Sequence, residues 1–336
     1  MRGAAARIAV TVAVTLLIAM AASGPASALD KIRFGIDWKA EAEYGGYYQA
    51  KATGLYAKHG LDVEIRQGGP QVNHPQLLAA GVLDFAISSN TSVALNFVAH
   101  DIPMVTVAAF FQKDPAVLIS HAEAHIKGFA DMKGKPILIS SDTREGWWLF
   151  LKAKFGLKDS QIRPYTFQMA PFLADKSAIQ QGYVTSEPYT LEKAGAKVDV
   201  HLIADAGWPS YGNLVTTSAR LIKQNPDLVQ RFVDATIEGW YSYLYGDPSP
   251  ANALIKKENP EMTDDLIANG IAKMKQYGIV DSGDARKDGI GALNPARIAA
   301  FFKIMADAGI YPKDMDWRKG FDFGFVNKKL GMRTGK

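Results

Sequence analysis

Five short segments concentrate the side chains that could contact a small molecule. They carry hydroxyl groups, amides, glycines and a few aromatic rings, and they comprise residues 37–48 (DWKAEAEYGGYY), 67–73, 88–92, 140–144 and 186–189. Such groups offer hydrogen bonds and stacking surfaces, which is the composition of a binding pocket more than of a catalytic centre. Because Ser, Thr and Asn are also ordinary N-caps of helices, the argument depends on the five segments together.

Residue patterns that support catalysis or metal binding are missing from the sequence. The chain has no cysteine, which excludes thiol catalysis, disulfides and Cys-ligated metals. His121 and His125 are four residues apart in HAEAH, but the glutamate stands one position late for the zincin pattern. Neither a G-x-S-x-G elbow nor a phosphate-binding glycine loop occurs. We therefore expect no catalytic residues, no metal and no cofactor, and a protein that is not an enzyme.

Short apolar runs alternate with helical patterns and position these segments. Strands are expected over 32–36, 61–65, 84–88 and 104–111, and again over 116–120, 136–140, 162–167, 198–203 and 213–217. Helices are expected over 46–53, 75–80, 91–100, 145–155 and 190–194, and then over 226–245, 250–257, 264–277 and 295–308. This alternation predicts an α/β fold with open, mostly parallel sheets. In such sheets ligands bind beyond the carboxyl ends of the strands, where the polar segments fall.

The first 28 residues have the layout of a secretory signal peptide. Arg2 and Arg7 precede an apolar stretch, and Ala26-Ser27-Ala28 forms a small-residue cleavage site. We expect cleavage near Ala28 and a periplasmic location. The formal charge is +4, and because residues 1–28 hold two arginines and no acid, the rest of the chain is close to neutral. Near-neutrality gives no electrostatic footprint for nucleic acid, and we expect a monomer.

The order of several motifs resembles one family of periplasmic solute-binding proteins. The runs are FGIDW, GGYYQAKATGLYAKHGLDVEI, GGPQVN, LLAAGVLDFAISSNTS and TSEPYTLEKAG. The family includes binders of thiamine pyrimidines, riboflavin, sulfonates and nitrate that serve ABC importers. The resemblance implies a two-lobed type II fold, with the ligand between the lobes and a permease as partner. It places lobe 1 at residues 29–112 and 218–336 and lobe 2 at residues 113–217.

The resemblance also implies a set of ligand-binding residues. Trp38, Tyr44 and Tyr47 would stack on or line the solute, while Tyr48 is expected to turn into the core. The polar contacts are expected from Asp37, Asn73, Ser88, Ser89, Asn90, Asp142, Thr143, Arg144, Glu187 and Tyr189.

The sequence leaves four interpretations of the ligand and activity open. An anion needs concentrated donors, yet only Arg144 and Arg66 are available, while Asp37, Asp142 and Glu187 would repel it. A heterocycle with N–H donors, such as a pyrimidine or thiamine precursor, is therefore favoured over a small anion, sulfonate or aromatic acid. An enzyme that makes the thiamine pyrimidine is disfavoured, because a cysteine-rich motif marks that branch. A receptor-type sensor would act through a separate partner.

Overall fold

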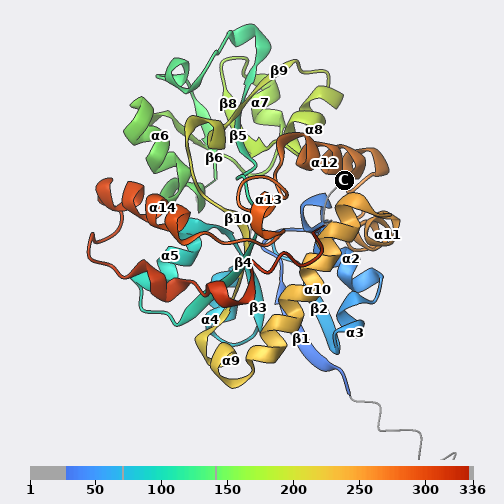
Figure 1. The fold of residues 1–336 in the computed structure, drawn as a ribbon. Coiled ribbons are helices and arrows are strands. Elements are labelled where there is room, and N and C mark those ends of the chain that lie inside the picture. The colour runs from blue at the N-terminus through green and yellow to red at the C-terminus, as the bar shows by residue number, and fades with distance from the viewer. Residues whose placement is uncertain (1–27, 70–71, 141, 333–336) are drawn as a thin grey trace, which may run out of the picture.

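Two five-stranded sheets form the framework of the molecule (Figure 1). The computed structural model describes residues 28–69, 72–140 and 142–332, so the expected signal peptide lies outside the described residues. The first sheet contains β1 (Asp30–Gly35), β2 (Leu61–Arg66), β3 (Phe85–Asn90), β4 (Met104–Phe111) and β10 (Gly212–Ser218). The second contains β5 (Ala116–His121), β6 (Ile137–Ile139), β7 (Ile162–Pro164), β8 (Ile179–Tyr183) and β9 (Val198–Leu202).

The two sheets share one topology. The strand orders are β2-β1-β3-β10-β4 and β7-β6-β8-β5-β9, and in each the fourth strand runs antiparallel to its neighbours. The remaining strands run parallel, as the alternating sequence pattern predicts. We call the first sheet with its packed helices the first lobe, and the second sheet with its helices the second lobe.

The strand β10 corrects one expected boundary. The family resemblance predicts that residues up to 217 belong to lobe 2, yet β10 pairs with β3 and β4 in the first sheet, with Leu214 opposite Ser88 and Ala109. The chain therefore returns to the first lobe before Gly212. A strand pattern alone gives no information about which sheet a strand joins, because the pairing depends on residues more than a hundred positions away.

Helices cover both sheets. They are α2 (Gly45–Ala52), α3 (Leu55–Lys58), α4 (His74–Ala79), α5 (Thr91–Ala99), α6 (Trp147–Phe155), α7 (Ala170–Ala174), α8 (Glu187–Lys193), α9 (Ala219–Gln224), α10 (Pro226–Tyr245), α11 (Ser249–Glu258), α12 (Asp264–Tyr277), α13 (Ala285–Asp288) and α14 (Pro295–Asp307). No helix in the described ranges is both long and apolar enough to cross a membrane.

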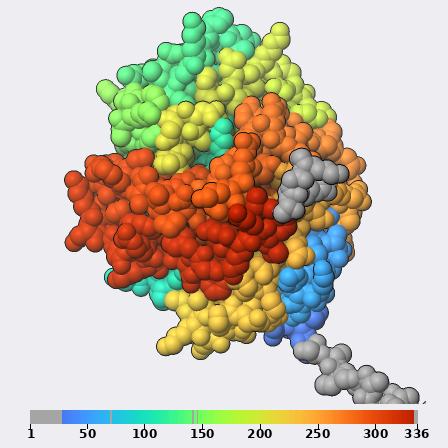
Figure 2. Space-filling view, in the orientation of Figure 1, coloured from blue at the N-terminus to red at the C-terminus, as the bar shows by residue number. Residues whose placement is uncertain are grey.

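The C-terminal helices return to the first lobe. The helix α10 packs along α2, and α14 contacts α5. Single bridges also connect Thr106 with Phe321 and Ala109 with Gly291, at the edge strand β4. Figure 2 shows these C-terminal segments, in orange and red, covering much of one face of the first lobe and meeting the second lobe.

The glycine pair of DWKAEAEYGGYY serves helix packing. A Cβ atom on Gly45 would lie 2.0 Å from the Tyr243 ring, and one on Gly46 would lie 2.2 Å from the Trp240 ring. Both rings belong to α10 and are fully buried. The two glycines therefore let α2 and α10 approach closely, and close approach of the backbone to a solute is not needed to explain them.

One central strand has no counterpart among the expected elements. The strand β8 reads IQQGY and pairs with both β5 and β6 in the middle of the second sheet. Its two glutamines and its glycine have low strand propensity, so the local pattern does not indicate a buried strand. The Gln181 side chain accepts hydrogen bonds from Ser140, and this bonding makes burial of its amide acceptable.

Candidate functional site

An acidic residue follows the first strand, at the edge of the first lobe where the sequence predicts ligand binding. Asp37 follows β1, and the Tyr44 hydroxyl donates a hydrogen bond of 2.7 Å to its Oδ1. Desolvation raises the pKa of Asp37, while hydrogen bonds from Ser89 and Tyr44 oppose the rise. Three of the predicted residues, Asp37, Tyr44 and Ser89, therefore form one connected polar group.

Two further acids lie just beyond, within segment 37–48 but not among the individual residues predicted to contact the ligand. Glu41 precedes and Glu43 lies within η1 (Ala42–Tyr44). Glu43 is only 4% exposed, and its Oε1 accepts a hydrogen bond from Thr185 of the second lobe. Desolvation raises the pKa of Glu43, the Thr185 bond opposes this, and Glu187 raises it further. This carboxylate thus lies at the interface between the lobes.

Glu187 is the acid that the second lobe contributes. Its Oε2 accepts hydrogen bonds from the Tyr183 backbone N–H at 2.7 Å and from the Ser186 hydroxyl at 2.6 Å. The Tyr165 hydroxyl donates to Oε1 at 3.2 Å. These three donors fix the carboxylate at the first turn of α8.

Carboxylates from the two lobes interact electrostatically. Desolvation, followed by the charges of Glu43 and Glu187, raises the pKa of Glu41 well above its usual value, and Lys39 opposes the rise. Like charges that approach in a region poor in water make each other harder to ionise. A ligand that brings positive charge or N–H donors would relieve this repulsion.

An aromatic pair bridges the same interface. Trp38 of the first lobe and Phe167 of the second have ring centroids 4.2 Å apart, with an angle of 44° between the rings. Phe167 also contacts Tyr165 at 4.9 Å and has a φ of +62°, which is uncommon for a bulky residue. The Trp38 ring is partly exposed. The two lobes therefore bring two tilted aromatic rings into contact beside the carboxylates.

Several predicted residues of the first lobe make contacts within the fold. Tyr47 is fully buried and donates a 2.5 Å hydrogen bond to Asn213, so it belongs to the core, as does Tyr48. Ser88 is paired with Thr216 at 3.0 Å inside the sheet. Asn73 and Asn90 accept hydrogen bonds from the first backbone N–H groups of α4 and α5. These are the N-cap roles that Asn residues commonly fill.

The described side chains among the remaining predicted residues of the second lobe form no hydrogen bond or ion pair with Glu41, Glu43 or Glu187. The Tyr189 hydroxyl donates to Asp265 of α12 at 2.9 Å, next to Lys193, and so connects α8 with the C-terminal region. Thr143 donates to the carbonyl of Ser140 at 3.0 Å. Arg144 is exposed, and the Asp142 side chain lies outside the described part.

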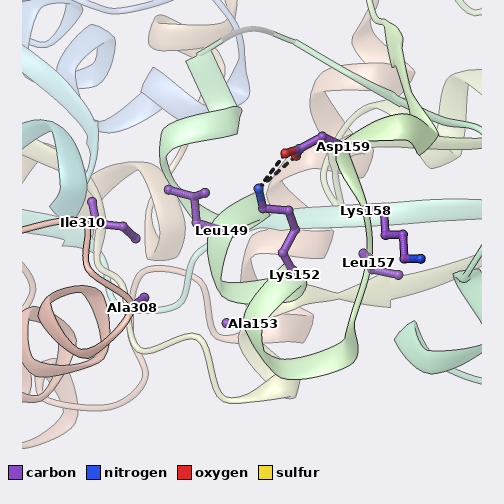
Figure 3. Close-up of a pocket in the computed structure, with 8 residues that line it drawn as sticks. All are labelled: Leu149, Lys152, Ala153, Leu157, Lys158, Asp159, Ala308 and Ile310. Carbon is purple, nitrogen blue, oxygen red and sulfur yellow. Dashed lines mark hydrogen bonds and ion pairs between the residues drawn. The ribbon is translucent and has the colours of Figure 1, made fainter.

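A separate surface hollow of about 590 Å³ lies where α6 meets the segment after α14 (Figure 3). Leu149, Ala153, Leu157, Ala308 and Ile310 supply its apolar lining. Lys152 at its rim is paired with Asp159 at 2.8 Å. None of the predicted site residues or the interlobe carboxylates lines this hollow. Within the described residues, no group of three or more acidic or histidine side chains is arranged to hold a metal ion.

Comparison with known proteins identifies the family. A family model described as NMT1/THI5 like matches residues 41–251, which is more than half of the chain. The chain belongs to the NMT1/THI5-like family. The matched range contains the interlobe carboxylates Glu41, Glu43 and Glu187, together with Thr185, which donates to Glu43.

Two curated relatives of this NMT1/THI5-like protein carry names of binding proteins. The riboflavin-binding protein RibY of Chloroflexus aurantiacus is 27% identical over 218 residues, which cover 63% of this chain and 62% of the relative. The chain therefore matches less than two thirds of that relative's length. The formylaminopyrimidine-binding protein of Halalkalibacterium halodurans is 23% identical over 247 residues, covering 69% of this chain and 72% of the relative.

Solved structures show the same fold. The periplasmic aliphatic sulphonate binding protein SsuA from Escherichia coli superposes with a TM-score of 0.67 at 16% identity, covering 86% of this chain and 91% of that one. The desulfurization enzyme DSZB superposes with a TM-score of 0.59 at 13% identity, covering 90% and 99%. The two-lobed α/β fold expected from the sequence is thereby confirmed, and the fold by itself admits both binding proteins and enzymes.

Proposed function

We propose that this chain is the periplasmic solute-binding component of an ABC importer, and that it binds an aromatic heterocycle with N–H donors between its lobes. The observation that carries the proposal is the interlobe group of Glu41, Glu43 and Glu187 beside the Trp38–Phe167 ring pair. Carboxylates accept hydrogen bonds from ring and exocyclic amino groups, and aromatic rings stack on a flat heterocycle. The names of two relatives, which are binders of riboflavin and of a formylaminopyrimidine, agree with this chemistry.

Contacts between the lobes supply a reason for the solute to favour the closed arrangement. Glu43 is bonded to Thr185 across the interface, and Trp38 contacts Phe167. A solute that contacts both groups interacts with residues of the two lobes simultaneously. It binds more tightly when the lobes are together, and it therefore shifts the population toward closure.

The positions of the basic residues disfavour an anionic solute. Arg66, one of the two candidate cations, is paired with Glu64 of its own strand at 2.9 Å, and Arg144 is exposed. Lys39 is paired with Glu261 at 2.7 Å on the surface. An anion placed among the interlobe carboxylates would be repelled, and these pairs leave little positive charge to offset the repulsion.

The same residues favour a protein that binds its solute without catalysing a reaction. The tyrosines and carboxylates of the interface are held by hydrogen bonds to one another, as Glu187 is to Tyr165 and Tyr183. Neither an activated nucleophile nor a base oriented by a third group is among the described site residues. We therefore propose binding and delivery to a membrane permease, and not catalysis.

Calorimetry with matched solutes tests the proposal. Purified protein should be titrated with a 4-aminopyrimidine and with the 4-methylpyrimidine of the same shape, which lacks the N–H donors. Riboflavin and an alkylsulfonate complete the panel. We expect tight binding that requires the amino group and that weakens in Glu43→Gln. Tight binding of the alkylsulfonate with no response to either pyrimidine would overturn the proposal.

Mass spectrometry of solute released from the denatured protein provides an independent check. A heterocycle with at least one N–H donor is the expected species. Recovery of a sulfonate or another strong acid, in stoichiometric amount, would contradict the assignment. Incubation of the identified solute with the protein should return it unchanged, whereas a converted product would indicate an enzyme.

A further inference from the structure

Two crossing segments, residues 112–115 and 207–211, connect the lobes. They are bound to each other by Asp114, whose Oδ2 accepts a 3.0 Å hydrogen bond from the Trp208 indole N–H. The other oxygen, Oδ1, accepts from the backbone N–H of Ala116 at 3.0 Å. Asp114 and Trp208 are both buried. Any rotation of one lobe against the other must change the backbone of these segments.

Arg297 of α14 contacts the backbone of both crossing segments. Its Nε donates to the carbonyl of Pro209 at 2.8 Å. Its Nη2 donates to the carbonyls of Gln112 at 2.7 Å and Ser210 at 2.9 Å. A single planar guanidinium therefore joins the outgoing segment to the returning one, which an ammonium group has too little reach and directionality to do.

The guanidinium itself is fixed from two sides. Its carbon lies 3.8 Å from the centre of the Tyr211 ring, and Nη1 is 3.6 Å from Asp284. Asp284 also accepts hydrogen bonds from the Tyr211 hydroxyl and, at 2.8 Å, from Asn294. The side chains of Arg297 and Asp284 are each 20% exposed, so solvent screens this group less than it screens a surface pair.

The same face of α14 touches the second lobe indirectly. Phe301, one turn after Arg297, contacts the Trp208 ring at 4.8 Å. The Trp208 ring also contacts Phe150 of α6 at 5.3 Å. In Figure 1, α14 lies next to α6, and the hollow of Figure 3 marks the outer side of this junction. One C-terminal helix therefore holds the hinge by hydrogen bonds and by an aromatic contact.

We propose that Arg297 is a positioning residue for interlobe movement, whose guanidinium holds the two crossing segments at one relative position. The angle between the lobes is then set by the C-terminal region as well as by the crossings. Removing the guanidinium frees three carbonyls and lets the crossings move independently. The proposal concerns the protein without solute, so it does not depend on which solute the protein binds.

Spin labels measure the predicted effect directly. Because the chain has no cysteine, Lys58→Cys in α3 and Glu192→Cys in α8, both at exposed positions, give one label on each lobe. Distances between the labels are recorded by pulsed electron resonance without solute. Arg297→Ala should increase the population at longer distances by about tenfold, the factor for one net charge-assisted hydrogen bond.

Two further variants make the result decisive. Arg318→Ala is the matched control, because Arg318 also lies over an aromatic ring, that of Trp317, but is largely exposed. It should leave the distribution unchanged. Arg297→Lys keeps the charge and loses the planar fork, and it should give an intermediate distribution even if Arg297→Ala does not fold. Distributions identical to the parent in folded Arg297→Ala or in Arg297→Lys would overturn the proposal.

Discussion

Asp114 allows a quantitative test of how the hinge is built. Burial raises the pKa of this carboxyl from 3.8 to about 6, against hydrogen bonds from Ala116 and Trp208 and the charge of Arg297. A shift of about 2 units corresponds to about 3 kcal/mol, because one unit is worth about 1.4 kcal/mol. The folded protein binds the proton more tightly than the unfolded chain does. The stabilisation is therefore fully present below pH 3.8 and is lost as the pH rises through 6.

Replacement by asparagine isolates this contribution. Asp114→Asn removes the titration and keeps one acceptor oxygen, so either the Trp208 or the Ala116 hydrogen bond is lost, at a cost of about 1–2 kcal/mol that does not depend on pH. Between pH 7.5 and pH 4.0, wild type should gain about 2.5 kcal/mol of unfolding free energy relative to the variant.

Urea unfolding followed by tryptophan fluorescence, from pH 4.0 to 8.0, measures the difference between the two proteins. Other carboxylates with raised pKa values, such as Asp37 and Glu43, are present in both and cancel in that difference. Parallel curves for wild type and Asp114→Asn would refute the reasoning. In that case the Asp114 carboxyl either ionises normally in the folded protein or is exposed to water.

Three other predictions concern the site and its support. Trp38→Ala should weaken solute binding by about 1–3 kcal/mol if the ring stacks on the solute, and unchanged affinity in calorimetry would remove Trp38 from the contacts. Binding of an aminopyrimidine should weaken as the pH falls, because desolvation raises the pKa of Glu43 and protonation of this carboxylate removes a hydrogen-bond acceptor. Glu43→Gln should flatten the dependence of affinity on pH. Equal slopes of affinity against pH in wild type and variant would argue against this role of Glu43. Gly46→Ala should destabilise the protein by about 1–3 kcal/mol, because the new Cβ meets the Trp240 ring at 2.2 Å; an unchanged urea midpoint would show that α10 can shift.

Local patterns account for much of the fold. Strand and helix periodicities place β1, β2 and α10 within a few residues of their observed ends, because burial on one face imposes the spacing of apolar residues. The prediction that the C-terminal helices return to the first lobe came from the family resemblance and not from these patterns. The sequence pattern does not predict the strand β8, because the amide of Gln181 is acceptable in a buried strand only through its hydrogen bonds with Ser140.

The sequence selects some of the polar residues that lie near the lobe interface, and which of them bind a solute stays a prediction. The rule that ligands lie beyond the carboxyl ends of strands selected Asp37 and Tyr44, which share a hydrogen bond, and the family motif selected Glu187, which accepts three. The same rule selected Asn90, whose side chain caps α5. Hydroxyls and amides are equally suited to caps and to ligands, so composition does not separate the two roles.

By itself, the sequence determined the α/β class, the two-lobed family and the acids and rings available after each strand. Only the tertiary structure decided which of them meet across the lobes. Thr185 bonds to Glu43 from 142 positions away, and Phe167 reaches Trp38 from the other sheet. Periodicity records which face of an element is buried, but it holds no information about the partner on the opposite lobe. That partner is fixed by the packing of two separately formed sheets and by the hinge that joins them.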